Sequence, residues 1–197
     1  MPTLIVDSPR RILALAGSLR RQSHNKALLR AASLLAPESA TIDVFDGLEM
    51  VPVFNEDLEG DGQEPAGVVR LRQEVLGSDG LLIATPEYNQ SVPGVVKNMI
   101  DWLSRGEGLS GRPVAVIGAS TGPWGTRIAQ TLLRQMLLSV QAVVMPAPTL
   151  FIPNVETILD ARGEINDPDT LERLESVVAA FADWIGSHVA TGSGLGR

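Results

Sequence analysis

Short apolar runs alternate along the chain with longer segments in which apolar side chains recur every three or four positions. The runs at residues 12–16, 80–85 and 113–119 show no polar alternation, which is typical of strands covered on both faces. Shorter strand patterns occur at 41–45 and 142–145. The helical periodicity predicts helices at residues 25–35, 66–76, 93–104, 127–140 and 168–186. Strands and helices are therefore expected to alternate along the whole chain.

This alternation predicts an α/β fold in which a five-stranded parallel sheet carries helices on both faces. We expect one domain over residues 1–197, with flexible ends at 1–10 and 190–197. The polar stretch 46–64 is too long for an ordinary connection, which suggests that it is functional or ordered by a partner. Residues 146–153 read as a proline-rich crossover without a strand.

Composition excludes several classes of function. The 23 acidic and 16 basic side chains give a net charge of −7, which argues against nucleic acid as the main partner. The absence of cysteine excludes thiol catalysis and fits a cytoplasmic protein, and two histidines are too few for a histidine-rich metal site. No apolar run approaches the roughly 18 residues of a membrane span, and no secretory signal is visible.

Three loops follow strands that should end at the same edge of the sheet, where α/β proteins bind ligands. The first loop leads into a helix and contains the donors that a phosphate dianion prefers: Ser18, Arg20, Ser23 and Asn25. It lacks both the glycine pattern of a dinucleotide site and the lysine of a nucleoside triphosphate loop. From this loop alone, a phosphate site and an ordinary turn with solvated arginines are equally acceptable.

The second and third loops add candidates for binding a flat ligand. In the second, Tyr88 is placed to lie near a ring, and Asn89 follows as a hydrogen-bond donor. The full second set is Pro86, Glu87, Tyr88 and Asn89. In the third, Ser120, Thr121 and Gly122 allow the backbone to approach a ligand closely. Each loop taken separately is also explained as a turn or as packing.

Taken together, the three loops resemble those of the NADPH-dependent FMN reductases. The resemblance rests on Gly-Ser-Leu-Arg at 17–20, on Pro-Glu-Tyr-Asn at 86–89 with the helix that follows, and on residues 52–59 and 181–185. It implies a flavodoxin-like three-layer sandwich. It also implies that Ser18, Arg20, Ser23 and Asn25 hold the FMN phosphate, that residues 86–89 lie along the isoalloxazine, and that residues 120–122 close the other side.

The resemblance further implies an oxidoreductase that takes NADPH or NADH as co-substrate and passes electrons to quinones or related small acceptors by a ping-pong cycle. Since the flavin carries the chemistry, no catalytic side chain is expected. FMN is expected rather than FAD because no dinucleotide pattern is present. A flavodoxin-type electron carrier and a flavin-free interaction protein are alternatives; Arg20 and the modest net charge favour the reductase.

The helix predicted at 93–104 is more apolar than one sheet face requires. We therefore expect at least a homodimer through this helix, with Trp102 at the contact and residues 46–64 reaching toward the partner; a homotetramer is also compatible. The alternative is that Trp102 packs within its own chain. Lys97 and Asp101, four residues apart, are expected to form an ion pair or a subunit contact.

Overall fold

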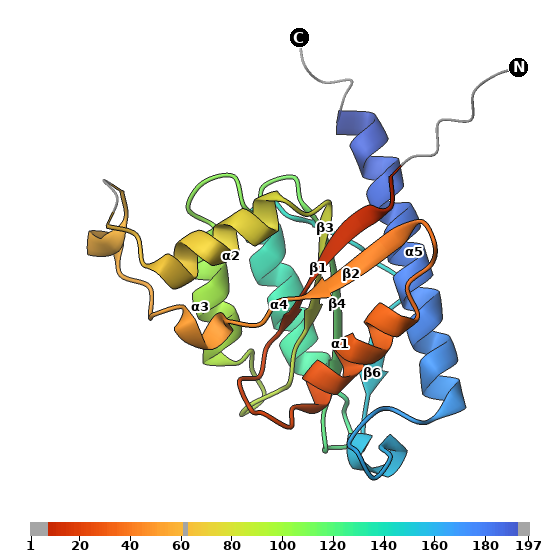
Figure 1. Ribbon diagram of the computed structural model, residues 1–197. Coiled ribbons are helices and arrows are strands. Elements are labelled where there is room, and N and C mark those ends of the chain that lie inside the picture. The colour runs from red at the N-terminus through yellow and green to blue at the C-terminus, as the bar shows by residue number, and fades with distance from the viewer. Residues whose placement is uncertain (1–7, 61–62, 193–197) are drawn as a thin grey trace, which may run out of the picture.

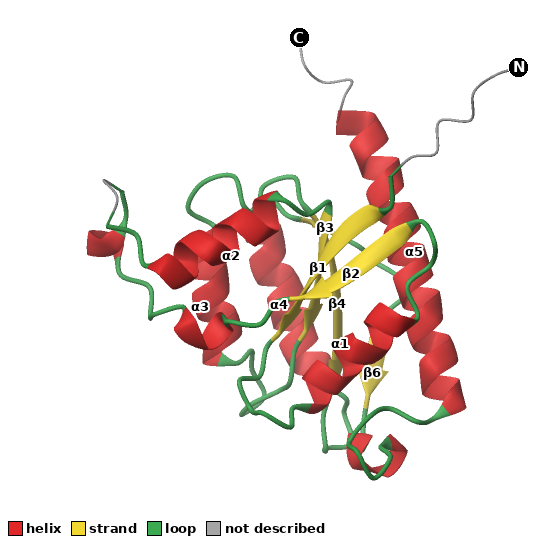
Figure 2. Cartoon of the chain, in the orientation of Figure 1, coloured by secondary structure: helices red, strands yellow, loops and turns green. Residues whose placement is uncertain are grey.

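The computed structural model describes residues 8–60 and 63–192, and it has the predicted three layers (Figure 1). The strands are β1 Arg10–Ala16, β2 Ala40–Val44, β3 Gly80–Ala84, β4 Pro113–Ala119, β5 Val143–Val144 and β6 Leu150–Ile152. The helices are α1 His24–Leu34, α2 Ala66–Leu76, α3 Gly94–Leu103, α4 Arg127–Ser139 and α5 Pro168–Gly192. Figure 2 shows α1 and α5 on one side of the sheet and α2, α3 and α4 on the other.

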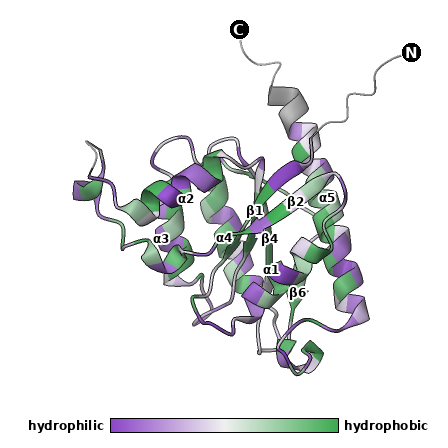
Figure 3. Cartoon of the chain, viewed as in Figure 1, coloured by the Kyte–Doolittle hydropathy of each residue, from purple (hydrophilic) through white to green (hydrophobic). Residues whose placement is uncertain are grey.

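The sheet is parallel, with the order β2-β1-β3-β4-β5. Successive side chains of a strand point to opposite faces, so β1 contributes to both cores. Ile12 and Ala14 pack in the cluster that contains α1 and α5, whereas Leu13 and Leu15 pack in the cluster beneath α2, α3 and α4. The helices accordingly carry one apolar and one polar side (Figure 3). This explains why the central runs are continuously apolar.

The predicted crossover at 146–153 contains a strand, so the prediction of an irregular segment there is wrong. β5 ends at Val144, and the chain passes Pro146 and Pro148 before β6 pairs with β4 through Leu150. Two short strands thus share the fifth position of the sheet. A run of three apolar residues between prolines is too short to be read as a strand from the sequence.

At the ends of the chain, regular structure extends further than predicted. Arg10 is the first residue of β1, and α5 continues to Gly192. Residues 1–7 and 193–197, which form most of the predicted flexible ends, lie outside the described residues. Within residues 8–60 and 63–192, no helix is long and apolar enough to cross a membrane.

The long connection between β2 and α2 folds back onto α3 of its own chain. The side-chain amide of Asn98 accepts from the N–H of Phe54 at 2.7 Å and donates to the carbonyl of Pro52 at 2.9 Å. The indole N–H of Trp102 donates to the same Pro52 carbonyl at 2.8 Å, and its ring meets Phe54 edge to face. Trp102 is completely buried. The prediction that it faces a partner is therefore wrong, whereas the predicted ion pair of Lys97 with Asp101 is present.

Candidate active site

The loops that follow β1, β3 and β4 meet around one cavity of about 180 Å³, called the loop cavity below. Nine of the eleven predicted site residues line it: Ser18, Arg20, Ser23, Asn25, Pro86, Glu87, Tyr88, Ser120 and Thr121. His24 and Ala119 complete the wall. Asn89 and Gly122 do not line it. The topology therefore brings together residues from three separate stretches of sequence.

The first loop passes unusually close to the second. The N–H of Gly17 donates to the carbonyl of Ala84 at 2.8 Å, at the end of β3. A β-carbon at Gly17 would lie 2.6 Å from the Cγ2 of Val96 and 3.1 Å from the Cδ of Pro86. Only glycine fits there without a shift of its neighbours. This approach brings the buried Ser18 hydroxyl within 3.4 Å of the Tyr88 hydroxyl.

The start of α1 has the features of an anion site. Ser23 is its N-cap, and its hydroxyl accepts from the N–H of Lys26 at 3.3 Å. The first N–H groups of a helix lack intrahelical acceptors and carry partial positive charge. Arg20 is exposed beside them, on the cavity wall. A phosphate bound here would meet backbone, hydroxyl and guanidinium donors at once.

Asn25 has a positioning role that the sequence did not reveal. Its side-chain oxygen accepts from the N–H of Ala119 at 3.0 Å, and its side-chain nitrogen donates to the carbonyl of the same residue at 2.9 Å. Only 2% of Asn25 is exposed. The oxygen and one hydrogen of the amide are thus occupied in joining the start of α1 to the end of β4. The expectation that Asn25 helps to hold a phosphate stays a prediction, for which the second amide hydrogen is left.

Glu87 caps α4. One of its carboxylate oxygens accepts from the N–H groups of Ile128 and Ala129, both at 3.0 Å. The residue at the cap position, Thr126, makes no side-chain cap bond and has a left-handed backbone with φ of 66°. A carboxylate at a helix N-terminus satisfies free donors and complements the helix dipole. Glu87 therefore fixes the second loop against the helix that follows the third loop.

Asn89 forms part of a tight turn. Asn89 and Gln90 both have left-handed backbones, with φ of 52° and 57°. Tyr88 and Ser91 close the turn with reciprocal backbone hydrogen bonds at 3.1 and 3.0 Å. Asparagine tolerates this conformation better than most residues, which explains its position. The turn leaves Tyr88 51% exposed at the mouth of the cavity.

The third loop is held by β6 and the segment after it. The N–H of Ser120 donates to the carbonyl of Ile152 at 3.0 Å, and the carbonyl of Gly122 accepts from the N–H of Asn154 at 3.1 Å. A β-carbon at Gly118 would lie 2.3 Å from both the Thr85 carbonyl oxygen and the Thr126 hydroxyl. The third loop thus has little freedom to move, although the backbone of Gly122 is engaged away from the cavity.

Comparison with known proteins identifies close relatives over nearly the whole chain. The sequence profile of the NADPH-dependent FMN reductase family matches residues 10–157. A 2-hydroxy-1,4-benzoquinone reductase from a Burkholderia species is 40% identical over 178 residues, covering 89% of this chain and 96% of that protein. A quinone reductase from Escherichia coli K12 is 36% identical over 177 residues, covering 88% and 94%.

A solved structure of a flavoenzyme is also similar to this chain over nearly its whole length. FerB, a flavoenzyme NAD(P)H:(acceptor) oxidoreductase from Paracoccus denitrificans, aligns with a TM-score of 0.81 and 37% identity, over 91% of this chain and 98% of that one. The profile match spans all three loops of the cavity.

Proposed function

The chain belongs to the NADPH-dependent FMN reductase family, and from this we propose that it passes hydride from NADPH or NADH through bound FMN to quinones or similar small acceptors, in ping-pong order. The observation that carries the proposal is the convergence of the three loops on one cavity at the carboxyl edge of the sheet. Bound FMN supplies the redox chemistry, so the protein's task is binding and orientation. We further propose one FMN-binding domain and a cytoplasmic location.

The donors around the cavity fit FMN. We assign Ser18, Arg20, Ser23 and the N-terminus of α1 to the phosphate, since they combine hydroxyl, guanidinium and backbone donors. These hydroxyl, guanidinium and backbone donors suit the oxygens of a single phosphate monoester. Asn25 supports the site by holding the end of β4 beside the start of α1.

The remaining wall fits a flat ring system. We assign Pro86, Glu87 and Tyr88 to one side of the isoalloxazine and Ser120 and Thr121 to the other. Glu87 supports the site by capping α4, and Asn89 supports it by forming the turn that presents Tyr88. Gly122 supports it through the backbone hydrogen bond that holds the third loop. No side chain is assigned an acid or base role. A quinone and the nicotinamide would use the same face in turn, which is why we propose ping-pong order.

With oxygen excluded, purified protein is expected to oxidise NADPH or NADH continuously only when a soluble quinone is supplied, and to release FMN on denaturation. Steady-state absorbance at 340 nm with each nucleotide measures the first result, and chromatography of the released flavin measures the second. Protein stripped of flavin is the control, and its activity should return with FMN. Stoichiometric FAD, or full activity without flavin, would contradict the proposal. Reduction only of a protein partner would favour the electron carrier.

We also propose that the chain forms a homodimer or homotetramer through the surface beside the loop cavity. The segment that contains Pro52 and Phe54 covers Trp102, so part of the apolar excess of α3 that suggested a contact through this helix is satisfied within the chain. The support for association is now the exposure of apolar side chains near the second and third loops: Tyr88 is 51%, Trp124 68% and Ile128 41% exposed. A cluster of exposed large side chains beside a site is typical of an interface.

Sedimentation velocity of the FMN-loaded protein at micromolar concentration is expected to show a species of at least twice the chain mass. Trp124→Ser should shift the equilibrium toward the monomer, whereas Leu34→Ser removes an exposed leucine at the end of α1 and serves as the control. A single monomeric species for the unaltered protein would end this proposal. Equal shifts for both variants would place the contact elsewhere.

A further inference from the structure

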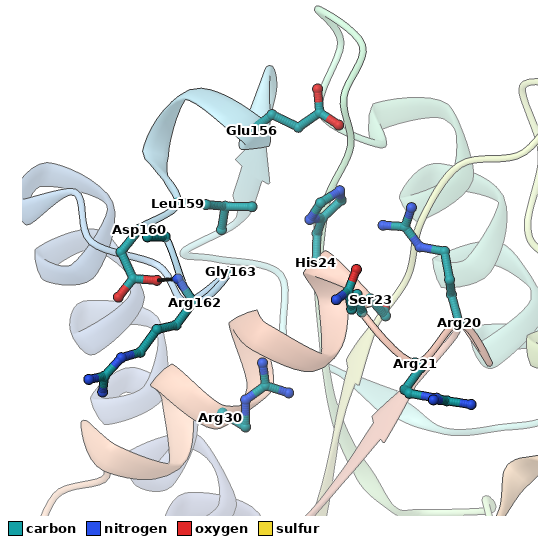
Figure 4. Close-up of a pocket in the computed structure, with 12 residues that line it drawn as sticks. Arg20, Arg21, Ser23, His24, Arg30, Glu156, Leu159, Asp160, Arg162 and Gly163 are labelled. Atoms are coloured by element: carbon teal, nitrogen blue, oxygen red, sulfur yellow. Dashed lines mark hydrogen bonds between the residues drawn. The ribbon is translucent and has the colours of Figure 1, made fainter.

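A second cavity adjoins the loop cavity on the far side of the start of α1. Its volume is about 540 Å³, three times that of its neighbour. Arg20, Ser23 and His24 line both cavities and therefore form the partition between them. Figure 4 shows α1 along one side of the second cavity and the segment that contains Glu156 to Gly163 along the other. Of the residues that line the second cavity, only Arg20 and Ser23 are also assigned to FMN.

The wall of the second cavity is polar and rich in arginine. Arg20, Arg21, Arg30 and Arg162 line it, against the carboxylates Glu156 and Asp160. Asp160 is engaged locally, because its carboxylate accepts from the N–H groups of Arg162 and Glu164. These bonds lower the pKa of Asp160 and keep it charged. Four guanidinium groups face two carboxylates on the wall and a third, Glu164, which pairs with Arg30, and this excess of positive charge favours an anionic ligand in a chain whose net charge is −7.

His24 supplies an independent sign of a missing partner. Its Nε2 atom is covered from solvent, yet no described residue bonds to it. Burial lowers the pKa of His24, and the nearby Arg20 acts in the same direction against a smaller opposing effect of Glu156. A buried polar atom without a partner is costly, so a ligand oxygen or hydroxyl at this position would be stabilised.

Arg30 marks the other end of the cavity. It lies six residues after His24 on α1, which at about 1.5 Å per residue separates the two by roughly 9 Å along the helix axis. Its guanidinium pairs with Glu164 at 2.7 Å, but both side chains are nearly half exposed. The Nε of Arg30 also donates to both carboxylate oxygens of Glu164, at 3.0 and 3.1 Å, so a phosphate at Arg30 must compete with Glu164 for the guanidinium. The two residues thus stand at different positions along α1, where two anionic groups of one ligand could be bound.

We propose that the second cavity binds the adenosine end of NADPH, with the pyrophosphate toward Arg20 and His24 and the 2′-phosphate at Arg30. This inference rests on the proposed function, which supplies a second phosphorylated ligand beside FMN. The ligand has two separated phosphate groups, which suits arginines at both ends of the cavity. The wall offers little apolar surface beyond Leu159 and Ala161, so recognition depends on the phosphates rather than on the base. The cavity thus favours NADPH over NADH.

The test uses the FMN-loaded protein with Arg30→Gln, Glu164→Gln and, as a charge-matched control on the exposed face of α5, Arg173→Gln. Arg30→Gln is expected to raise the KM for NADPH about tenfold, to change the KM for NADH less than threefold, and to leave kcat within twofold. Glu164→Gln frees Arg30 and should leave the KM for NADPH unchanged or lower it. If both variants raise it equally, Arg30 acts only through the salt bridge and the proposal is overturned.

A binding measurement that needs no turnover completes the test. By calorimetry, adenosine 2′,5′-bisphosphate should bind the FMN-loaded protein at least tenfold more tightly than adenosine 5′-monophosphate, and Arg30→Gln should abolish that difference. Equal binding of the two nucleotides, or equally tight binding of inorganic phosphate, would overturn the proposal. If neither NADPH nor NADH supports quinone reduction, the proposed function fails, whereas binding of the bisphosphate still reports on the cavity. The two failures are therefore distinguishable.

Discussion

Trp102→Ala is expected to lower the free energy of unfolding by about 3–5 kcal/mol, the range for removing a large buried aromatic side chain. Trp102 is fully buried, and its loss leaves a cavity between α3 and the segment that contains Phe54. It also leaves the Pro52 carbonyl without one of its two donors. Against a typical total of about 5–15 kcal/mol, this loss is severe. Urea unfolding of the flavin-free protein, followed by circular dichroism, measures it.

Leu34→Ala provides the surface control. Leu34 is 87% exposed and lies outside the proposed subunit contact, so its truncation should change the free energy of unfolding by about 0.5 kcal/mol or less. Trp102→Phe keeps most of the packing but loses the hydrogen bond to Pro52, and an intermediate cost of about 1–2 kcal/mol is expected. Similar losses for Trp102→Ala and Leu34→Ala would show that the connection after β2 is not held as described.

The apolar pattern predicted the fold well because the central strands are buried on both faces. The bounds of α2 and β4 match the prediction, and those of β1 and α1 differ by one or two residues. A continuous apolar run can be recognised in the sequence without knowledge of the tertiary contacts of its residues. β6 escaped prediction because three apolar residues between prolines carry no periodicity, and pairing with β4 gives them their structure.

The composition of the site was predictable, but the roles of its side chains were less so. Loop residues at the carboxyl ends of parallel strands necessarily converge, which explains why nine of the predicted residues line one cavity. In contrast, Asn25 bonds a residue 94 positions away, and Glu87 caps a helix that begins 40 positions later. Contacts at that separation depend on the packed arrangement of the loops. Trp102 shows the same effect, since its partner Pro52 comes from a segment without periodicity.

In the first loop, Arg20 is the charged side chain whose role decides between a phosphate site and an ordinary turn. Arg20→Ala is expected to weaken FMN binding by about 1.5–3 kcal/mol, the scale of a hydrogen bond to a charged group. This corresponds to a roughly 10- to 150-fold rise in Kd. The phosphate would keep the hydroxyls of Ser18 and Ser23 and the N-terminus of α1, so binding should be weakened rather than abolished. Titration of flavin-free protein with FMN, followed by quenching of flavin fluorescence, measures the change.

The neighbouring arginine provides the control for this measurement. Arg21 is also exposed, but it lines only the second cavity, so Arg21→Ala removes the same charge one residue away without touching the loop cavity. Its effect on the Kd for FMN should be less than about threefold, because exposed charges at that range are largely screened. Riboflavin, which lacks the phosphate, should bind the unaltered protein and Arg20→Ala equally. If Arg20→Ala weakens riboflavin as much as FMN, the guanidinium acts on the ring or on the fold, and the phosphate assignment of the first loop is wrong.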